Sequence, residues 1–338
     1  MSWGVKSIFV LGCVISTSAV WASGEQVGTL TNVTRDVKIF SHPGKSVQGP
    51  PPHALFEGEY YSVQDAKPGD KLDNGNIIRT APGSAAKVVY DNGDQFQVGS
   101  GTAYRVSLPK AKGAPQINLL YGKLRAVVEK GGPRTGMKIK TRSATMGVRG
   151  TDFFIADGGS KGTEIAVLRG EVEVKPEGSK AQAAKIPAGY TADIAAPPPV
   201  EEKKEMKKGE VAKKVEPAPV QAVEVRKVTQ EDLAGIKKVA EAAKAESTIK
   251  AAVKEEEQLK KLEAKAGEAT MRDIQKTDPK LYEEVKRQGI ASADALNEKV
   301  IQKVAVTAPS APEKRKPYMS ELEDLENGAY DHYFKKVD

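Results

Sequence analysis

The stretch from Lys140 to Ile155, Lys-Thr-Arg-Ser-Ala-Thr-Met-Gly-Val-Arg-Gly-Thr-Asp-Phe-Phe-Ile, constrains the fold of this chain more than any other. Gly147 and Gly150 can take the positive φ angles that a tight bend requires. From Thr151 onward the residues alternate between two faces with the period of two that is typical of a β-strand. The stretch therefore predicts two strands joined by a tight turn.

Residues 24–196 continue this pattern, because short β-like runs alternate with Gly, Pro, Asn and Asp. A unit of strand, glycine and strand recurs loosely around Gly93, Gly122, Gly170 and Gly189. The unequal spacing argues against a strict repeat array and favours short strands that bend at glycines around a narrow core. We therefore predict an all-β N-terminal module, either an irregular β-solenoid or a two-sheet β-roll.

The composition changes sharply near residue 197, and no aromatic residue occurs between Tyr190 and Tyr282. Residues 197–228 are rich in Pro, Lys and Glu, which predicts an extended linker. Residues 229–306 are predicted to be a charged helical region. Residues 307–338 are predicted to be a disordered tail. The fold class is thus an all-β module followed by a helical, partly disordered C-terminal tail.

Three helices are predicted in this tail. Thr229, with an acidic residue three positions later, resembles a capping box and opens a helix from Gln230 to about Lys265. Asp278-Pro279 starts a second helix, since Pro fits the first helical position. Leu296, Val300 and Val304 mark one face of a third. The apolar stripes are thin, so the tail is predicted to lack a sizeable core of its own and not to fold cooperatively, whereas residues 24–196 fold alone.

Residues 1–22 predict a secretory signal peptide. A lysine precedes a short apolar run, and Val20-Trp21-Ala22 suits cleavage after Ala22. The alternatives are an uncleaved anchor and lipidation at Cys13, because the residues before this cysteine resemble a lipobox. Once the signal is removed, no other segment is apolar enough to span a membrane. The expected location is the periplasm or the extracellular space.

Charge and cysteine content exclude several classes of protein. The chain has 338 residues, with 52 Lys and Arg against 45 Asp and Glu, for a net charge of +7. Residues 1–200 hold 24 basic and 17 acidic residues, so the whole excess lies there. This excess is well short of the level in nucleic-acid-binding proteins. Cys13 is the only cysteine, so an internal disulfide is impossible.

Several motifs, taken in order, resemble the FecR domain, a periplasmic β-module of bacterial envelope regulators. They are Lys67-Pro-Gly-Asp-Lys-Leu72, Asn76-Ile-Ile-Arg-Thr80, Ser84-Ala-Ala-Lys-Val-Val-Tyr-Asp-Asn-Gly93, Gly147-Val-Arg-Gly-Thr151, Val167-Leu-Arg-Gly-Glu-Val-Glu-Val174 and Pro187-Ala-Gly189. The resemblance covers roughly residues 28–194. It implies an all-β fold outside the cytoplasm.

The well-known members of this family carry a cytoplasmic segment that holds a sigma factor, then one membrane span, then this domain. Only seven residues precede the apolar run here. We therefore expect no sigma-binding segment, and the sigma-control mechanism is not carried over. The expected architecture is therefore a secreted β-module joined to a charged helical tail.

A cluster of cations in the β-module gives the candidate binding site. Lys138 and Lys140 share one strand face at period two and Arg142 continues it, while Arg125 and Arg149 belong to the same cluster. Such a ridge could bind carboxylates or phosphates, or it could be an ordinary solvated strand face. Arg149 could instead stabilise its own turn by binding a carboxylate such as that of Asp152.

Signals for catalysis are poor. The three histidines lie far apart, and the sequence shows no metal-ligand spacing, phosphate-binding loop or nucleophile motif. We therefore predict a protein that is not an enzyme and uses no cofactor or metal. Its FecR-like module is predicted to bind, scaffold or signal to another envelope protein. The alternative is a module that binds peptidoglycan or an anionic glycan.

Overall fold

The computed structural model describes residues 26–107, 116–130, 136–179, 182–196, 223–248, 253–310 and 335–337. Predictions for residues 1–25, including the signal peptide, lie outside these residues. The strands are β1 (Gln26–Thr34), β2 (Val37–Gly44), β3 (His53–Phe56), β4 (Glu59–Asp65), β5 (Lys71–Asp73), β6 (Ile77–Thr80), β7 (Ala85–Tyr90), β8 (Gln95–Val98), β9 (Thr102–Ser107), β10 (Gln116–Val128), β11 (Met137–Lys140), β12 (Ala144–Val148), β13 (Thr151–Asp157), β14 (Thr163–Arg169), β15 (Glu171–Pro176), β16 (Ala184–Pro187), β17 (Tyr190–Ile194), β18 (Val223–Lys227) and β19 (Lys335–Val337). The helices are α1 (Gln230–Lys244), α2 (Val253–Thr277), α3 (Pro279–Arg287) and α4 (Ala293–Thr307), with a short 3-10 turn at Gly159–Lys161.

The strands form two layers that share β10. Sheet A has the order β5-β1-β7-β8-β10-β13-β14-β17-β18. Sheet B has the order β19-β3-β4-β2-β6-β9-β10-β11-β12-β15-β16. Only the β10–β11 pair is parallel among these pairings. The prediction of a mainly β N-terminal module followed by helices is confirmed, and its two sheets match the β-roll alternative.

Gly122 is the point at which β10 passes from one sheet to the other. Residues before it pair with β9 in sheet B, and residues after it pair with β13 in sheet A. Its φ is 96°, and a Cβ atom there would lie 2.4 Å from Oγ1 of Thr102. A side chain at this position would therefore be strained and would clash, which explains why a glycine is required.

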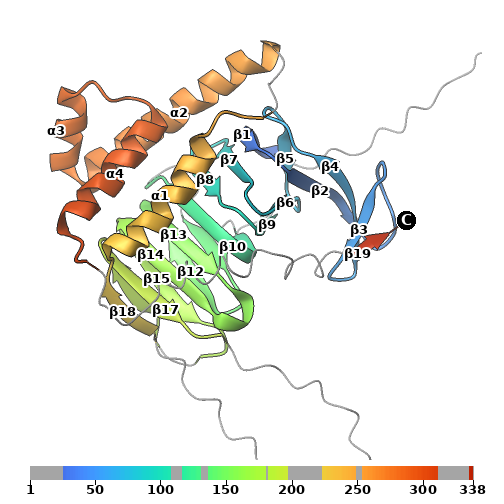
Figure 1. Cartoon of the computed structure of the whole chain (residues 1–338), viewed down its shortest axis with the longest axis horizontal. Helices are drawn as coiled ribbons and strands as arrows, with labels where there is room; N and C mark the ends of the chain where they lie inside the picture. Colours follow the sequence, from blue (N-terminus) through green and yellow to red (C-terminus); the bar gives the residue numbers. More distant parts are fainter. Residues whose placement is uncertain are drawn as a thin grey trace, which may run out of the picture.

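The main core lies between the two sheets. Leu30, Phe96 and Phe153 from sheet A and Ile39 and Ile139 from sheet B belong to one cluster of buried apolar residues. The opposite face of sheet A is also buried, because the helices cover it (Figure 1). Every residue of β7, β13 and β14 is consequently buried, which a strand with one wet face would not show.

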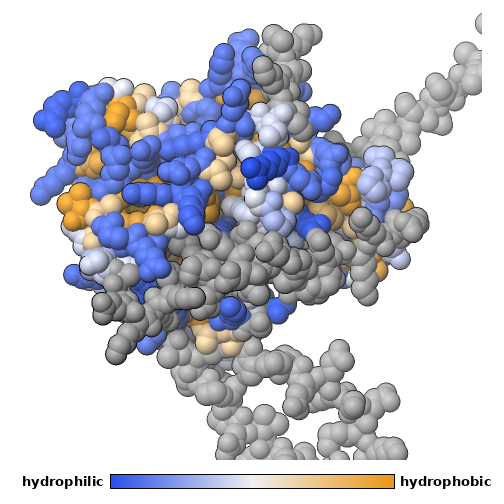
Figure 2. All heavy atoms as spheres, viewed as in Figure 1, coloured by the Kyte–Doolittle hydropathy of each residue, from blue (hydrophilic) through white to orange (hydrophobic). Residues whose placement is uncertain are grey.

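The helices contribute a second core that they share with sheet A. Leu233 and Ile236 of α1 and Leu296 of α4 cluster with Phe154 and Leu168 of the sheet. The outer surface of the helices is dominated by hydrophilic side chains (Figure 2). The sequence predicted that the tail lacks a large core of its own, but it did not predict this shared core. The reason is that its apolar partners come from residues 154–168 of sheet A. No helix in the described part of the chain is long and apolar enough to cross a membrane.

The predicted starts of three helices are confirmed, but the first predicted helix is divided into two helices, α1 and α2. Thr229 forms the capping box with Asp232, Asp278 caps α3, and α4 follows the third predicted face. The first helix ends at Lys244 rather than near Lys265, and α2 begins after a break. Ser247 and Thr248 in this break bond to the end of β1, so tertiary contacts hold the chain out of the helix.

Two strands occur where none was predicted. Val223–Lys227, placed in the linker, forms β18 beside β17. Lys335–Val337, placed in the disordered tail, forms β19 beside β3. Both are edge strands formed with distant partners, so their local sequence carries little signal. The division of the chain into domains remains a prediction.

Candidate interaction site

The outer face of sheet B carries the candidate site. In β11, Met137 and Ile139 are buried, while Lys138 and Lys140 are exposed. This alternation follows from the pleat of a strand whose inner face packs on the core. Arg142 is exposed in the bend after β11. The predicted common face of the two lysines is therefore present, and Arg142 extends it past the end of the strand.

Acidic residues lie beside these cations. The register places Lys138 opposite Gly147 of β12, which in turn lies opposite Glu173 of β15. Nζ of Lys140 is 3.9 Å from Oε1 of Glu177. Glutamate side chains of β15 and of the turn after it thus lie among the lysines of this face. It is a mixed surface with a local excess of positive charge at β11, which suits selective rather than indiscriminate attraction of anions.

A buried carboxylate fixes the backbone at Arg142. Asp157, at the end of β13, accepts a hydrogen bond from the N–H of Gly159 at 2.8 Å through Oδ1. Its Oδ2 accepts one from the N–H of Arg142 at 3.4 Å. Burial raises the pKa of Asp157 to about 7, although both backbone hydrogen bonds and the charge of Arg142 oppose this rise.

The turn between β12 and β13 is built around one of the two predicted glycines. Gly150 has a φ of 67°, as predicted, and a Cβ atom there would lie 2.3 Å from Cβ of Lys130. Gly147 lies within β12 and is absent from the positive-φ residues, so its predicted role in the turn is wrong. Arg149 is exposed at the turn.

Arg125 does not lie on this surface. Its side chain and that of Asp152 are both 0% exposed, and its Nε and Nη2 bind the two carboxylate oxygens at 3.0 and 2.8 Å. Nη2 also donates to the carbonyl of Asn297 in α4 at 2.8 Å. The half of β10 that holds Arg125 belongs to sheet A, whose outer face the helices cover. We therefore remove Arg125 from the candidate site. The prediction that Arg149 could bind Asp152 is also wrong, because Asp152 is buried and its two carboxylate oxygens are bound by Arg125.

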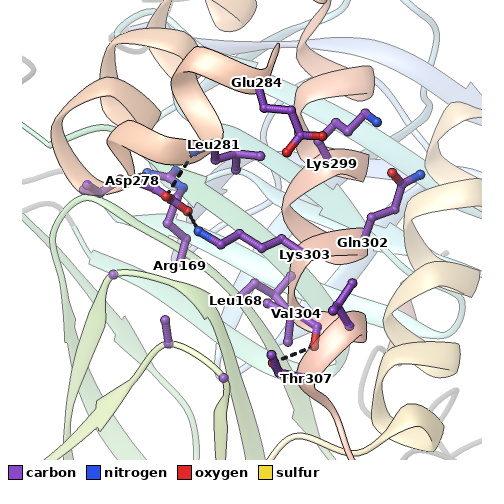
Figure 3. A pocket seen from close by; sticks show the side chains of 15 residues that line it. Leu168, Arg169, Asp278, Leu281, Glu284, Lys299, Gln302, Lys303, Val304 and Thr307 are labelled. Atoms are coloured by element: carbon purple, nitrogen blue, oxygen red, sulfur yellow. Dashed lines mark hydrogen bonds and ion pairs between the residues drawn. The ribbon is translucent and has the colours of Figure 1, made fainter. Parts of the chain in front are cut away.

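A hollow of about 740 Å³ lies where the helices meet the end of sheet A. Figure 3 shows Arg169 rising from β14 on one side and Lys303 reaching Asp278 from α4. Arg169 is buried and bonds to Asp273 and to Oγ1 of Thr277, the latter at 3.0 Å. Arg169, Asp278 and Lys303, three of the charged residues that line this hollow, are thus paired within the chain.

The match to known families falls on the β layers. Residues 76–173 match the family described as FecR protein. We call this matched part of the chain, residues 76–173, the FecR domain. No curated protein matches the chain.

Two solved structures resemble part of the chain, and each is described as a putative anti-sigma factor from Parabacteroides distasonis ATCC 8503. One is 18% identical, with a TM-score of 0.31, and the match covers 35% of this chain and 54% of that one. The other is 13% identical, with a TM-score of 0.36, and the match covers 48% and 64%. The chain thus spans less than two thirds of the length of either structure.

The FecR domain contains the whole cationic part of the candidate site. It runs from Asn76, just before β6, to Glu173 in β15, and so includes Lys138, Lys140 and Arg142. The first five strands, β1 to β5, and the last four strands, β16 to β19, lie outside the match. They complete the sheets on either side of the matched residues, and the wider resemblance over residues 28–194 remains a prediction.

Sequence reasoning missed the buried charges that join the FecR domain to the helices. Lys87 is 2% exposed, and its Nζ lies 2.6 Å from Glu263 and 2.9 Å from Asp294. Arg226 binds the buried Glu164 and Asp232. Lys87 interrupts the apolar run Ala-Ala-Lys-Val-Val-Tyr, which was a usable signal of a buried, paired lysine. In the described part of the chain, no group of His, Cys, Asp and Glu could hold a metal ion.

Proposed function

We propose that this chain is a secreted, non-enzymatic envelope protein whose FecR domain binds another envelope protein through the outer face of sheet B. One observation supports this choice above others. The chain's own helices cover the outer face of sheet A, whereas the outer face of sheet B exposes Lys138, Lys140 and Arg142. A partner that meets the FecR domain face-on therefore meets these cations.

The geometry suits recognition of spaced carboxylates. Side chains two residues apart on a strand are roughly 7 Å apart, so the two lysines offer a pair of evenly spaced donors. Glu173 and Glu177 beside them would repel an anion that is out of register. Opposite charges attract a partner, and nearby like charges select its orientation. An acidic patch on a protein fits this pattern.

Peptidoglycan or an anionic glycan is the second candidate. The same cations could bind regularly repeated carboxylates of a polymer. The regular spacing of Lys138 and Lys140 is the observation that favours it. A polymer would bind in many registers, so it would be less sensitive than a protein to the position of the acidic neighbours.

The test reverses the charge of the face. Lys138→Glu, Lys140→Glu and Arg142→Glu in one variant should abolish capture of the partner from an envelope extract. The matched control reverses three exposed lysines of the helices, Lys237, Lys260 and Lys280, and should bind as wild type. Exposed charges contribute roughly 0–1 kcal/mol per pair to stability, so the melting temperature should change little.

Two further arms separate the candidates. Binding through exposed charges weakens as salt rises, because they are screened within about 10 Å at 0.1 M. Treatment of the extract with muramidase should leave capture of a protein unchanged and should release a cell-wall polymer. If the folded triple variant binds as well as wild type at both salt concentrations, this face is only a solvated surface and the proposal fails.

A further inference from the structure

Three carboxyl groups surround one guanidinium where β18, at the margin of sheet A, leads into α1. Arg226 of β18 lies 2.6 Å from Oδ2 of Asp232 in α1, 3.1 Å from Oε1 of Glu164 in β14 and 3.6 Å from Oδ2 of Asp193 in β17. We call these four residues the Glu164 cluster. They are the charged groups that act on Glu164 from the strands and the helix packed around it.

Asp232 takes most of what Arg226 can offer. Nη1 and Nη2 of Arg226 donate to the two oxygens of Asp232 at 2.6 and 3.1 Å. The N–H and the hydroxyl of Thr229 donate to the same carboxylate, both at 2.8 Å. The one positive charge of the cluster is therefore matched by Asp232, and little of it remains to compensate a second buried carboxylate.

Glu164 receives hydrogen bonds on one oxygen only, although it is 2% exposed. Its Oε1 accepts from Nη2 of Arg226 at 3.1 Å and from Oγ1 of Thr191 at 3.4 Å. Its Oε2 is buried, and none of the described residues donates a hydrogen bond to it. A buried ionised carboxylate needs donors on both oxygens, whereas a protonated carboxyl group carries its proton on one of them. The geometry therefore favours a neutral Glu164 with its proton on Oε2.

The electrostatics of the cluster agree with this geometry. Burial, followed by the charges of Asp232 and Asp193, raises the pKa of the Glu164 carboxyl to about 8, against the opposing effects of Arg226 and of the hydrogen bond from Thr191. The stabilisation by this group is fully present below the ordinary pKa of a glutamate and is lost as pH rises to about 8. Glu164 is thus protonated at neutral pH and ionises just above it.

We propose that ionisation of Glu164 releases β18 and the start of α1 from sheet A, so that the Glu164 cluster acts as a pH-sensitive switch. Ionisation places a further negative charge beside Asp232 and Asp193 at a site with little access to water, and like charges repel most strongly there. Arg226 belongs to β18 and Asp232 to the first turn of α1, so the repulsion acts on both elements.

Release of this segment would uncover part of the outer face of sheet A. Val228 and Leu233, on either side of the helix start, belong to the apolar core that the helices share with Phe154 and Ala166. Phe154 and Ala166 would therefore become accessible when the segment detaches. This inference does not depend on the partner proposed for sheet B, because the Glu164 cluster lies on the other sheet.

Hydrogen exchange of the purified full chain between about pH 5 and pH 8 tests the proposal. The reporters are the amide of Val228, which donates to the carbonyl of Gly189, and that of Leu233, which donates to the carbonyl of Thr229. After correction for the intrinsic exchange rate, their opening constant should rise about tenfold per pH unit, because opening releases one proton. The amides between β10 and β13 are the internal reference, since any effect of pH on the whole fold, such as that of Asp157, appears there as well.

Two variants assign this pH dependence to one carboxyl group. Glu164→Gln keeps an acceptor for Arg226 and Thr191 but cannot ionise, so the reporters should stay as protected near pH 8 as near pH 5. Glu171→Gln removes an exposed glutamate of β15 and should keep the pH dependence of the wild type. Wild-type reporters with no more pH dependence than the reference, or a Glu164→Gln chain that keeps the wild-type dependence, overturn the proposal.

A measurement on the wild type decides the matter if Glu164→Gln does not fold. Carbon-13 NMR of the full chain labelled at the glutamate side-chain carboxyls follows each of them through its titration. One carboxyl should titrate near pH 8, well apart from the rest, and the change should coincide with the loss of protection at Val228. A chain in which every glutamate is ionised by about pH 6 contradicts the proposal.

Discussion

Individual buried polar groups in this protein are held where strands change sheets or meet helices. Asp152 and Arg125 neutralise each other under α4, and Asp157 receives two backbone N–H groups at the end of β13. Removal of one partner from such a buried pair costs far more than the pair contributes, because the remaining charge has no water. These buried residues therefore contribute to the stability of the fold, whereas the cations of β11 lie on an exposed face.

Gly150 and Arg149 should respond to mutation very differently, although they are neighbours. Gly150→Val introduces a β-branched residue at positive φ, which costs on the order of 1–3 kcal/mol, and its Cβ would also clash with Lys130. Arg149→Ala removes an exposed side chain and should change stability by about 0.5 kcal/mol or less. Thermal melting of the two variants beside wild type measures both effects. Equal shifts would contradict the turn described here.

Asp157 should make stability depend on pH in the neutral range. Burial raises the pKa of the Asp157 carboxyl from its ordinary value to about 7, so folding favours the protonated carboxyl. The stabilisation is fully present below about pH 4 and is lost as pH rises to about 7, by roughly a few kcal/mol at most. Asp157→Asn stays neutral and keeps an acceptor for one N–H. The stability difference between variant and wild type, measured by urea unfolding, should therefore shift in favour of the variant as pH rises from 4 to 7.

A difference that does not change with pH would show that Asp157 titrates at its ordinary value.

At the scale of elements, the connection between α1 and α2 is fixed by the edge of sheet A. Nδ2 of Asn32, near the end of β1, donates to the carbonyls of Ala243 and Ala245 at 3.0 and 2.8 Å. The N–H of Val33 donates to Oγ of Ser247 at 3.0 Å. These contacts take up backbone groups that a continuous helix would use, and so α1 ends at Lys244.

Asn32→Ala should loosen this connection without unfolding the sheets. Three hydrogen bonds of about 1 kcal/mol each would be lost, because Oδ1 of Asn32 also accepts a hydrogen bond from Oγ of Ser247. The carbonyls at the end of α1 can turn to water instead. Limited proteolysis after Lys244 should become faster, while hydrogen exchange in β10 and β13 stays slow. Asn118→Ala, on the other sheet, provides a comparison. Unchanged cleavage would mean that Ser247 and Thr248 hold the segment alone.

At the scale of the whole molecule, the helices act as a third layer on the FecR domain. Phe154, Ala166 and Leu168 would face water without them, and Lys87 and Arg125 would lose partners. The helices in turn have thin apolar stripes that need the sheet. Each part thus completes the core of the other.

A chain that ends at residue 196 should therefore be less stable than the full chain. The sequence predicts that residues 24–196 fold alone, and that remains testable in the same experiment. We expect the fragment to melt at a lower temperature and to bind a hydrophobic dye, because sheet A would expose an apolar patch. A fragment with the melting temperature of the full protein would show that the helices contribute nothing to the stability of the FecR domain.

The sequence alone determined those features that depend on near neighbours. Gly150 at a turn, the alternation of Lys138 and Lys140, the capping box at Thr229 and the FecR motifs all follow from φ preferences, strand periodicity or local hydrogen bonds. These constraints act over a few residues, so they can be predicted from the sequence alone.

Only the tertiary structure decided which faces are covered. Arg125 and Lys138 belong to one cationic cluster in the sequence, yet one is fully buried beneath α4 and the other is exposed. The difference arises because β10 changes sheets at Gly122 and because a helix more than 160 residues later lies on its outer face. The strand β18 likewise forms only when β17 is in place. Burial and edge pairing depend on partners distant in the chain, and no local pattern encodes which segment will supply them.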